Sequence, residues 1–266
     1  MKHLFYILVA SVLLSSCGEF QKVLKSEDTA AKFQLGEQLY NEGKYNKANR
    51  LFTQIVPSYR GKPQAEKLMY LYANTFYETG EDYLAGYQFE RFVTAYPRSE
   101  KLEEAYYKSA ISYAALSPVY SKDQHETKNA LEKLQLFANL YPSSSYMPEV
   151  NKTVKELQYK LELKAYSIAK QYNHISDYQA SIKSFDNFIV DFPGSSLREK
   201  ALFYRFDSAY QLATKSVESK RQERLEKAKS YYSAFKKLYA QSEFIEDAEK
   251  MNEDINKQLE QYSTNS

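Results

Sequence analysis

The residue that most clearly implies chemistry is Cys17, the only cysteine in a chain of 266 residues. Lys2 gives the chain a positive start, and an apolar run from Leu4 to Leu14 follows it, interrupted only by Ser11. This run has the size of a signal peptide and is too short to cross a bilayer as a helix. It ends in Leu14-Ser15-Ser16-Cys17, the pattern of a bacterial lipobox. We therefore predict a signal peptide at residues 1–16 and a covalent lipid, diacylglycerol plus an N-acyl chain, on Cys17.

An ordinary secretory signal that happens to contain a cysteine is the alternative to a lipobox. The lipobox is favoured because Cys17 has no other cysteine to compete with and stands at the expected distance from Lys2. A single cysteine cannot form a disulfide within its own chain. The acyl chains would anchor the rest of the protein to a membrane without a spanning helix.

No other residues are spaced for catalysis or for metal binding. Of the three histidines, His3 is lost with the signal peptide, and the other two stand alone without partners at ligand spacing, so a solvated or structural role fits them best. The acidic pairs are adjacent in sequence and therefore point to different parts of a helix, as solubility charges do. No glycine-rich phosphate loop is present, and a net charge of +2 gives no footprint for nucleic acid. We expect no enzyme activity, no cofactor other than the lipid, and no metal. The three histidines are His3, His125 and His174, and the acidic pairs include Glu81-Asp82 and Glu103-Glu104.

A recurring aromatic segment predicts how the chain is built. Phe92-Val-Thr-Ala-Tyr96-Pro97 has close copies ending at Pro142 and Pro193, a copy with Ala240 in place of proline, and a weaker one around Tyr59. The second aromatic recurs every 37 to 51 residues. A recurrence of this length is the signature of a helical repeat array. Only seven glycines and seven prolines interrupt the chain, which favours long helices.

The repeats align with the tetratricopeptide pattern of helix pairs, with small residues where the two helices of a pair cross. We predict an all-α superhelical array of about five such repeats. Helices are expected over 102–116 and 148–172, and a polar one over 244–261 closes the array. Ser26 is expected to cap the first helix, and Ser196 with Glu199 to form a capping box. The predicted organisation is a lipidated tether at 17–29, repeats 1–3 at 30–146, and repeats 4–5 with a capping helix at 147–262.

The resemblance to tetratricopeptide arrays also implies a binding surface, because the first helices of such pairs line a concave groove. An asparagine beside tyrosines could hold a peptide backbone while the rings hold apolar side chains. The alternative is that these are half-buried packing residues. Carried over by register, the candidate groove residues are Phe33, Tyr40 and Asn41 in the first pair, Tyr70, Asn74 and Tyr77 in the second, and Tyr107 in the third.

The ordered set of motifs resembles the BamD family, the lipoprotein subunits of the outer-membrane β-barrel assembly machine. It comprises the lipobox, Gln21-Lys22-Val23-Leu24-Lys25-Ser26, Tyr59-Arg60-Gly61, the Phe92 segment, the loop Ser117 to Gln124, and Leu134-Gln135-Leu136-Phe137. The likeness covers nearly all of the mature chain.

That resemblance implies a lipid-anchored protein on the periplasmic face of the outer membrane. It would bind a BamA-like barrel subunit through POTRA domains, receive the C-terminal segments of unfolded outer-membrane proteins, and meet other accessory lipoproteins. The alternatives are another envelope repeat scaffold, in cell division or bound to peptidoglycan, and an enzyme, for which no nucleophile, base or metal site is present.

Overall fold

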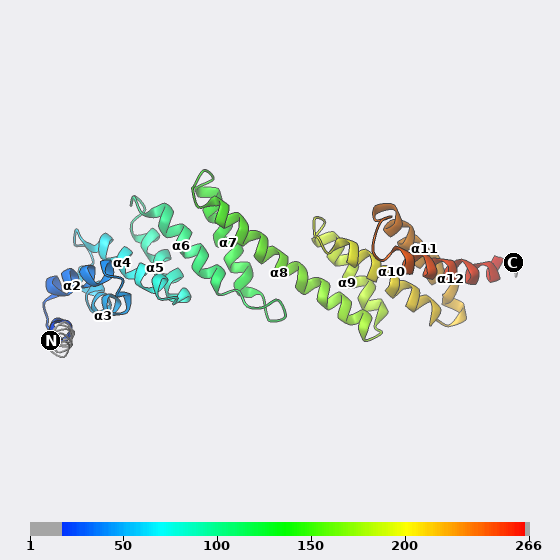
Figure 1. Cartoon of the computed structure of the whole chain (residues 1–266), viewed down its shortest axis with the longest axis horizontal. Coiled ribbons are helices and arrows are strands. Elements are labelled where there is room, and N and C mark those ends of the chain that lie inside the picture. The colour runs from blue at the N-terminus through cyan, green and yellow to red at the C-terminus, as the bar shows by residue number, and fades with distance from the viewer. Residues whose placement is uncertain (1–17, 264–266) are drawn as a thin grey trace, which may run out of the picture. The chain divides into compact units, whose positions relative to one another are not determined.

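The computed structural model describes residues 18–263, and over this range it contains helices and no strand. The signal peptide at 1–16 and the lipid-bearing Cys17 lie outside the described residues, so both stay predictions. The expected all-α fold is confirmed (Figure 1). The helices are α2 (Thr29–Asn41), α3 (Tyr45–Ile55), the 3₁₀ helix η1 (Val56–Tyr59), α4 (Ala65–Glu78), α5 (Asp82–Ala95), α6 (Leu102–Ala115), α7 (His125–Leu140), α8 (Met147–His174), α9 (Tyr178–Asp191), α10 (Arg198–Thr214), α11 (Glu218–Leu238) and α12 (Ile245–Ser263).

The chain divides into two compact units. The first ends at Leu157, and the second begins at Gln158 and also takes in the short loop Val119–Lys122. The sequence places the division between residues 146 and 147, so the two boundaries differ by eleven residues, from 146 to 157. The reason is that the first turns of α8 complete the core of the first unit, where Val150 and Leu157 are buried beside Phe137.

Each helix pair is held by phenylalanines of its second helix. In the first unit these rings are fully buried, and so are their counterparts in the second: Phe52, Phe89, Phe92 and Phe137, then Phe185, Phe188 and Phe235. Close crossing requires a small residue opposite such a ring. A Cβ added at Gly36 of α2 would lie 2.5 Å from Cε1 of Phe52. The sequence pattern of small and aromatic residues thus sets the helix spacing, as in close-packed cores generally.

The recurring aromatic segment forms the same turn each time. Its second aromatic ends the second helix with φ between −127° and −136° and ψ between 52° and 64°. The copy ending at Tyr239 keeps this geometry although Ala240 replaces proline. Proline therefore favours the turn, since it cannot continue a helix, but the turn does not depend on it.

A serine two residues beyond the proline position stabilises the chain after each of these turns. Ser99 Oγ accepts a hydrogen bond from the backbone N–H of Lys101 at 3.1 Å. Ser144, Ser195 and Ser242 do the same for the residue two positions ahead. The expected capping box at Ser196 and Glu199 is therefore wrong: Ser195 provides the side-chain contact, and the N-cap residue of α10 is Leu197.

Residues 18–25 are helical, so the expected tether is wrong for this segment. Phe20 is only 4% exposed and belongs to the core of the first helix pair. The expected cap at Ser26 is also wrong. Its hydroxyl donates to the carbonyl oxygen of Val23, and Asp28 caps α2 by accepting from the N–H groups of Ala30 and Ala31.

The turn inside three of the pairs needs a left-handed residue. Gly43 and Gly80 supply it with φ of 72° each, but Ser176 does so with φ of 65°. A side chain in this region costs about 1–2 kcal/mol. We therefore expect Ser176→Gly to stabilise the second unit by about 0.5–1 kcal/mol, measured by urea unfolding. Ser176→Ala should give no such gain, and equal gains from both changes would contradict the argument.

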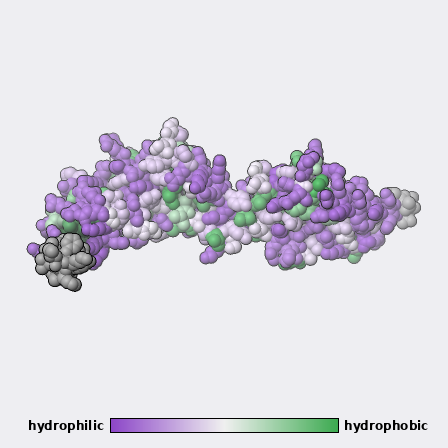
Figure 2. Space-filling view, in the orientation of Figure 1, coloured by the Kyte–Doolittle hydropathy of each residue, from purple (hydrophilic) through white to green (hydrophobic). Residues whose placement is uncertain are grey.

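Among residues 18–263, no helix has the length and apolar content that spanning a bilayer requires. Hydrophilic residues predominate on the face of both units drawn in Figure 2.

Candidate functional site

The first helices of the first three pairs, α2, α4 and α6, bring four of the candidate tyrosines into one electrostatic neighbourhood. Burial raises the pKa of Tyr40 to about 12, and the negative charge of Glu78 is the second cause of this rise. Burial also raises the pKa of Tyr77, and the negative charges of Glu149 and Glu78 add to this rise. A fifth ring comes from just before α8, where Tyr146 stacks on Tyr107 with centroids 4.0 Å apart. We call Tyr40, Tyr70, Tyr77, Tyr107 and Tyr146 the tyrosine face.

The raised pKa values keep the phenols of Tyr40, Tyr70, Tyr77 and Tyr107 protonated at neutral pH, so they can donate hydrogen bonds. Burial, reinforced by the hydrogen bond to Glu149, raises the pKa of Tyr107, whose hydroxyl donates to that carboxylate at 2.5 Å. Burial and the hydrogen bond to Glu104 raise the pKa of Tyr70 in the same way. Each ring thus combines an apolar body with a polar tip.

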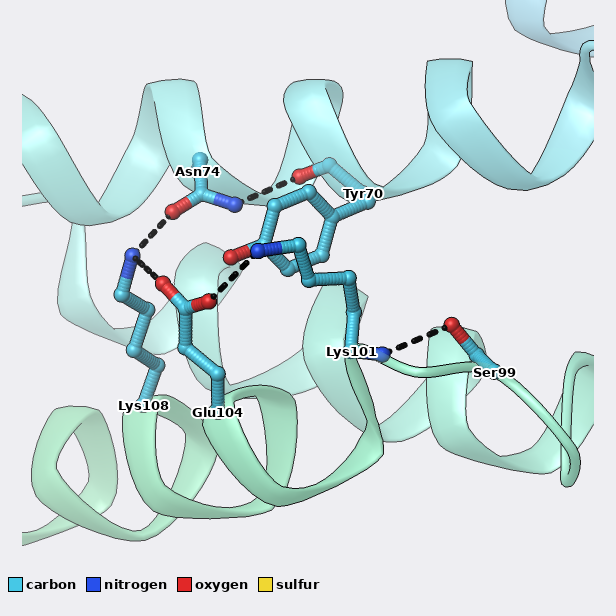
Figure 3. Close-up of polar contacts among 6 residues, drawn as sticks. All are labelled: Tyr70, Asn74, Ser99, Lys101, Glu104 and Lys108. Carbon is cyan, nitrogen blue, oxygen red and sulfur yellow. Dashed lines mark hydrogen bonds and ion pairs between the residues drawn. The ribbon is translucent and has the colours of Figure 1, made fainter. Parts of the chain in front are cut away.

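A polar cluster around Glu104 and Lys108 joins α4 to α6 (Figure 3). The ammonium group of Lys108 lies 2.9 Å from Oε1 of Glu104 and donates to the side-chain oxygen of Asn74. The same ammonium lies 5.1 Å from the ring centroid of Tyr77. Lys101 lies 3.3 Å from the other oxygen of Glu104 and 5.3 Å from the ring centroid of Tyr70. The cluster therefore places two cations beside two rings of the tyrosine face.

The carboxylate of Glu104 is held ionised by this cluster. Burial opposes ionisation, but hydrogen bonds from Tyr70 and Lys108, and then the charge of Lys108, lower its pKa to about 2. The depressed pKa contributes stability above the ordinary value of 4.5, and that stability is lost as pH falls from 4.5 towards 2.

We expect Glu104→Gln to flatten the pH dependence of stability in this window. The difference in the free energy of unfolding between pH 6 and pH 3 should shrink by about 1–2 kcal/mol after solvent screening is allowed for. Urea unfolding at the two pH values measures it. Glu156→Gln, at an exposed site on α8, is the control, and a similar flattening there would contradict the role of the cluster.

Three of the candidate groove residues, Asn74, Phe33 and Tyr107, lie inside the protein instead of on its surface. Asn74 is fully buried, its amide N–H donates to the carbonyl oxygen of Tyr70 at 2.9 Å, and its oxygen accepts from Lys108. This corrects the expectation that it would hold a peptide backbone. Phe33 is 7% exposed and stacks on Tyr59 with centroids 5.6 Å apart, so it belongs to the core.

The other candidates keep an accessible part. Tyr40 is half-buried at the end of α2 and packs edge-on against Tyr45, with centroids 5.3 Å apart. Asn41, the last residue of α2, is exposed. Tyr70 and Tyr77 are half-buried. Tyr107, by contrast, is buried in the core beside Phe137, and its hydroxyl donates to Glu149.

Sequence reasoning missed the charged members of the site. Lys108 and Glu104 stand four apart on α6, a spacing that places them on one helix face. That signal was present in the sequence, but it does not show that Asn74 of another helix lies opposite. Tyr146 stands five residues after the recurring aromatic Tyr141, outside the helix positions that define the register.

The two histidines that the structure describes lie apart from the tyrosine face, and no metal-binding group is found with them. Residues 18–263 contain no group of three or more histidine, cysteine or acidic side chains that could hold a metal ion. His125 and His174 are both exposed, the first at the start of α7 and the second at the end of α8. The first unit thus brings together aromatic rings, phenol hydroxyls and lysine charges on α4 and α6.

Comparisons with known proteins show which family, curated protein and solved structure the chain is similar to. A family model named YfiO, described as an outer membrane lipoprotein, matches residues 25–225. The outer membrane protein assembly factor BamD of Caulobacter vibrioides is 22% identical over 218 residues, which cover 81% of this chain and 71% of that protein. A crystal structure of a kinesin light chain of Podospora anserina with nearly identical TPR-like repeats matches with a TM-score of 0.33 and 12% identity, over 78% of this chain and 95% of that one.

Proposed function

The chain belongs to the YfiO family of outer membrane lipoproteins, and from this membership we propose that it is a non-enzymatic subunit of a β-barrel assembly complex. It acts from the periplasmic face of the outer membrane, anchored by acyl chains on Cys17. It binds a BamA-like barrel subunit through POTRA domains and helps to receive unfolded outer-membrane proteins, together with other accessory lipoproteins. The name of the Caulobacter relative, an assembly factor, supports this reading.

The observation that carries the receiving role is the tyrosine face of the first unit. Its rings offer apolar contact, and Lys101 and Lys108 lie within 5.3 Å of the ring centroids of Tyr70 and Tyr77. Rings for apolar contact and lysines for a negative charge are the groups that an extended segment ending in an aromatic residue and a carboxylate would need. Interfaces of this kind are rich in tyrosine because a ring buries much area at little cost in side-chain entropy.

Depletion of the protein in its own bacterium tests the proposal. We expect the folded barrels of the outer membrane to fall together, while inner-membrane proteins keep their levels, as measured by quantitative proteomics of separated membranes. Normal barrels combined with a defect in division or in peptidoglycan would contradict the proposal and favour another envelope scaffold. Restoration by wild-type protein, but not by a Cys17→Ala variant, would tie the function to the anchor.

A further inference from the structure

The segment that follows the lipid-bearing position is part of the folded protein. Residues 18–25 form a helix, and its buried face packs on the first helix pair through Phe20, Val23 and Leu24. Phe20 is 4% exposed. The hydroxyl of Ser26 donates to the carbonyl oxygen of Val23 at 2.9 Å and closes the end of this helix. The segment is therefore held in place by the core of the first unit.

Two cations of α3 lie over the ring of Phe20. The ammonium group of Lys47 is 5.5 Å from the ring centroid, and the guanidinium carbon of Arg50 is 5.3 Å from it. Arg50 is exposed and Lys47 is half-buried. The exposed face of the 18–25 helix adds Lys22 and Lys25 against the single acid Glu19. Cations therefore outnumber acids on the exposed face of this helix and beside Phe20, while Glu27 and Asp28 follow in the turn before α2.

The chain leaves little room between this surface and a lipid on Cys17. Phe20 is the third residue after Cys17, and even a fully extended chain spans at most about 11 Å over these three steps. A flexible tether would let the protein rise from the bilayer, whereas a packed helix starting one residue after the lipid cannot. Anionic headgroups attract lysine and arginine within about a Debye length, which is roughly 8–10 Å.

We propose that Phe20, held between Lys47 and Arg50, fixes the first helix pair against the membrane and places these two cations at the phosphates of the lipid headgroups. This inference rests on the lipid anchor of the proposed function. Each cation at an anionic surface contributes about 1 kcal/mol, a factor of about 5 in the balance between the apposed and the released first unit.

Lysine acetylation read by mass spectrometry tests the proposal on the full lipidated chain. The acetylation rate of Lys47 is measured for protein on vesicles containing phosphatidylglycerol and for protein in neutral detergent micelles, and the two rates are compared. We expect a slower rate on the vesicles, restored by high salt, while exposed Lys128 of α7 reacts equally in both. Equal rates at Lys47 in vesicles and micelles would overturn the proposal.

Two variants separate apposition from folding. Phe20→Ala should raise the acetylation rate of Lys47 on vesicles to the rate measured in detergent micelles, but this change also opens the core. Arg50→Gln leaves Phe20 in place and should reduce the apposed population relative to the released one about fivefold. Lys128→Gln, which removes an exposed charge far along the sequence, should change nothing. Protection of Lys47 that survives Arg50→Gln unchanged would count against the headgroup contact.

The anchor itself is tested separately. Mass spectrometry of the native protein shows whether Cys17 is acylated. In a second arm, a maleimide lipid is coupled to Cys17, the only thiol of the chain, and the acetylation test is repeated. Protection in this arm without native acylation would support the apposition and contradict the anchor of the proposed function. Native acylation of Cys17 without protection of Lys47 in either arm would support the anchor and contradict the apposition.

Discussion

Replacing Phe89 by alanine is expected to lower the free energy of unfolding by about 3–5 kcal/mol. The ring is fully buried in α5 and contacts the rings of Tyr70 and Tyr77 at centroid distances of 6.2 and 6.3 Å. Its loss leaves a cavity beneath the tyrosine face, because neighbouring helices relax only in part. Urea unfolding followed by circular dichroism measures the effect.

Tyr87, two residues earlier on the same helix, is the matched control. It is 45% exposed, so Tyr87→Ala should change the free energy of unfolding by no more than about 0.5 kcal/mol. Similar losses from both substitutions would contradict the assignment of Phe89 to the core. Because Phe89 supports Tyr70 and Tyr77, the Phe89→Ala variant should also bind peptides more weakly, even at a temperature where it is still folded.

Removing two rings of the tyrosine face should weaken the capture of barrel C-terminal peptides. We expect Tyr40→Ala combined with Tyr77→Ala to cost roughly 2 kcal/mol of binding free energy, about 30-fold in Kd, since buried aromatic anchors dominate such interfaces. Fluorescence anisotropy of a labelled peptide that ends in an aromatic residue measures it. The helical signal of the variant should remain that of the wild type.

The control for this pair is Tyr83→Ala combined with Tyr87→Ala. These tyrosines lie on α5, the second helix of its pair, and are 63% and 45% exposed. The loss of two equally aromatic but differently placed rings should leave Kd unchanged. Unchanged affinity in the Tyr40 and Tyr77 variant would remove the tyrosine face from client binding, whereas equal weakening in both variants would indicate contact through exposed rings in general.

Local patterns in the sequence predicted the helices well. The recurring aromatic segment located the end of every second helix from α5 to α11, because a buried phenylalanine and a helix-ending residue must keep a fixed spacing. The long helix expected over 148–172 is α8, at Met147–His174. Errors fell at the caps, where a neighbouring serine or aspartate can take the same role. Which one does so depends on backbone geometry that a pattern of residue types does not contain.

The site was predicted less completely, since its chemistry depends on contacts between helices. The helical register found the half-buried tyrosines of α2 and α4, but it also assigned buried Tyr107 to the surface, as it did Phe33 and Asn74. Their burial follows from partners distant in sequence, Tyr59 for the ring of Phe33 and Lys108 for the amide of Asn74. A single sequence without tertiary contacts cannot distinguish a half-buried ring from a core ring on one helix face.

The segment after Cys17 was also predicted incorrectly, because its packing depends on contacts with the first helix pair. Its polar composition, with Glu19, Gln21, Lys22 and Lys25, suggested a tether. The apolar residues Phe20, Val23 and Leu24 stand at positions that share one face of a helix, which is the spacing that predicts packing. Eight residues are too few to reveal this pattern reliably, because isolated helices of that length are not stable without a surface to pack on.

Mass spectrometry of the complex that co-purifies with the protein from gently solubilised outer membranes tests the central claim most directly. We expect a BamA-like barrel subunit with POTRA domains to be recovered with it in a fixed ratio, and peptides of unfolded barrels in smaller amounts. Reproducible recovery of the lipidated protein without any such barrel subunit would contradict its role in barrel assembly.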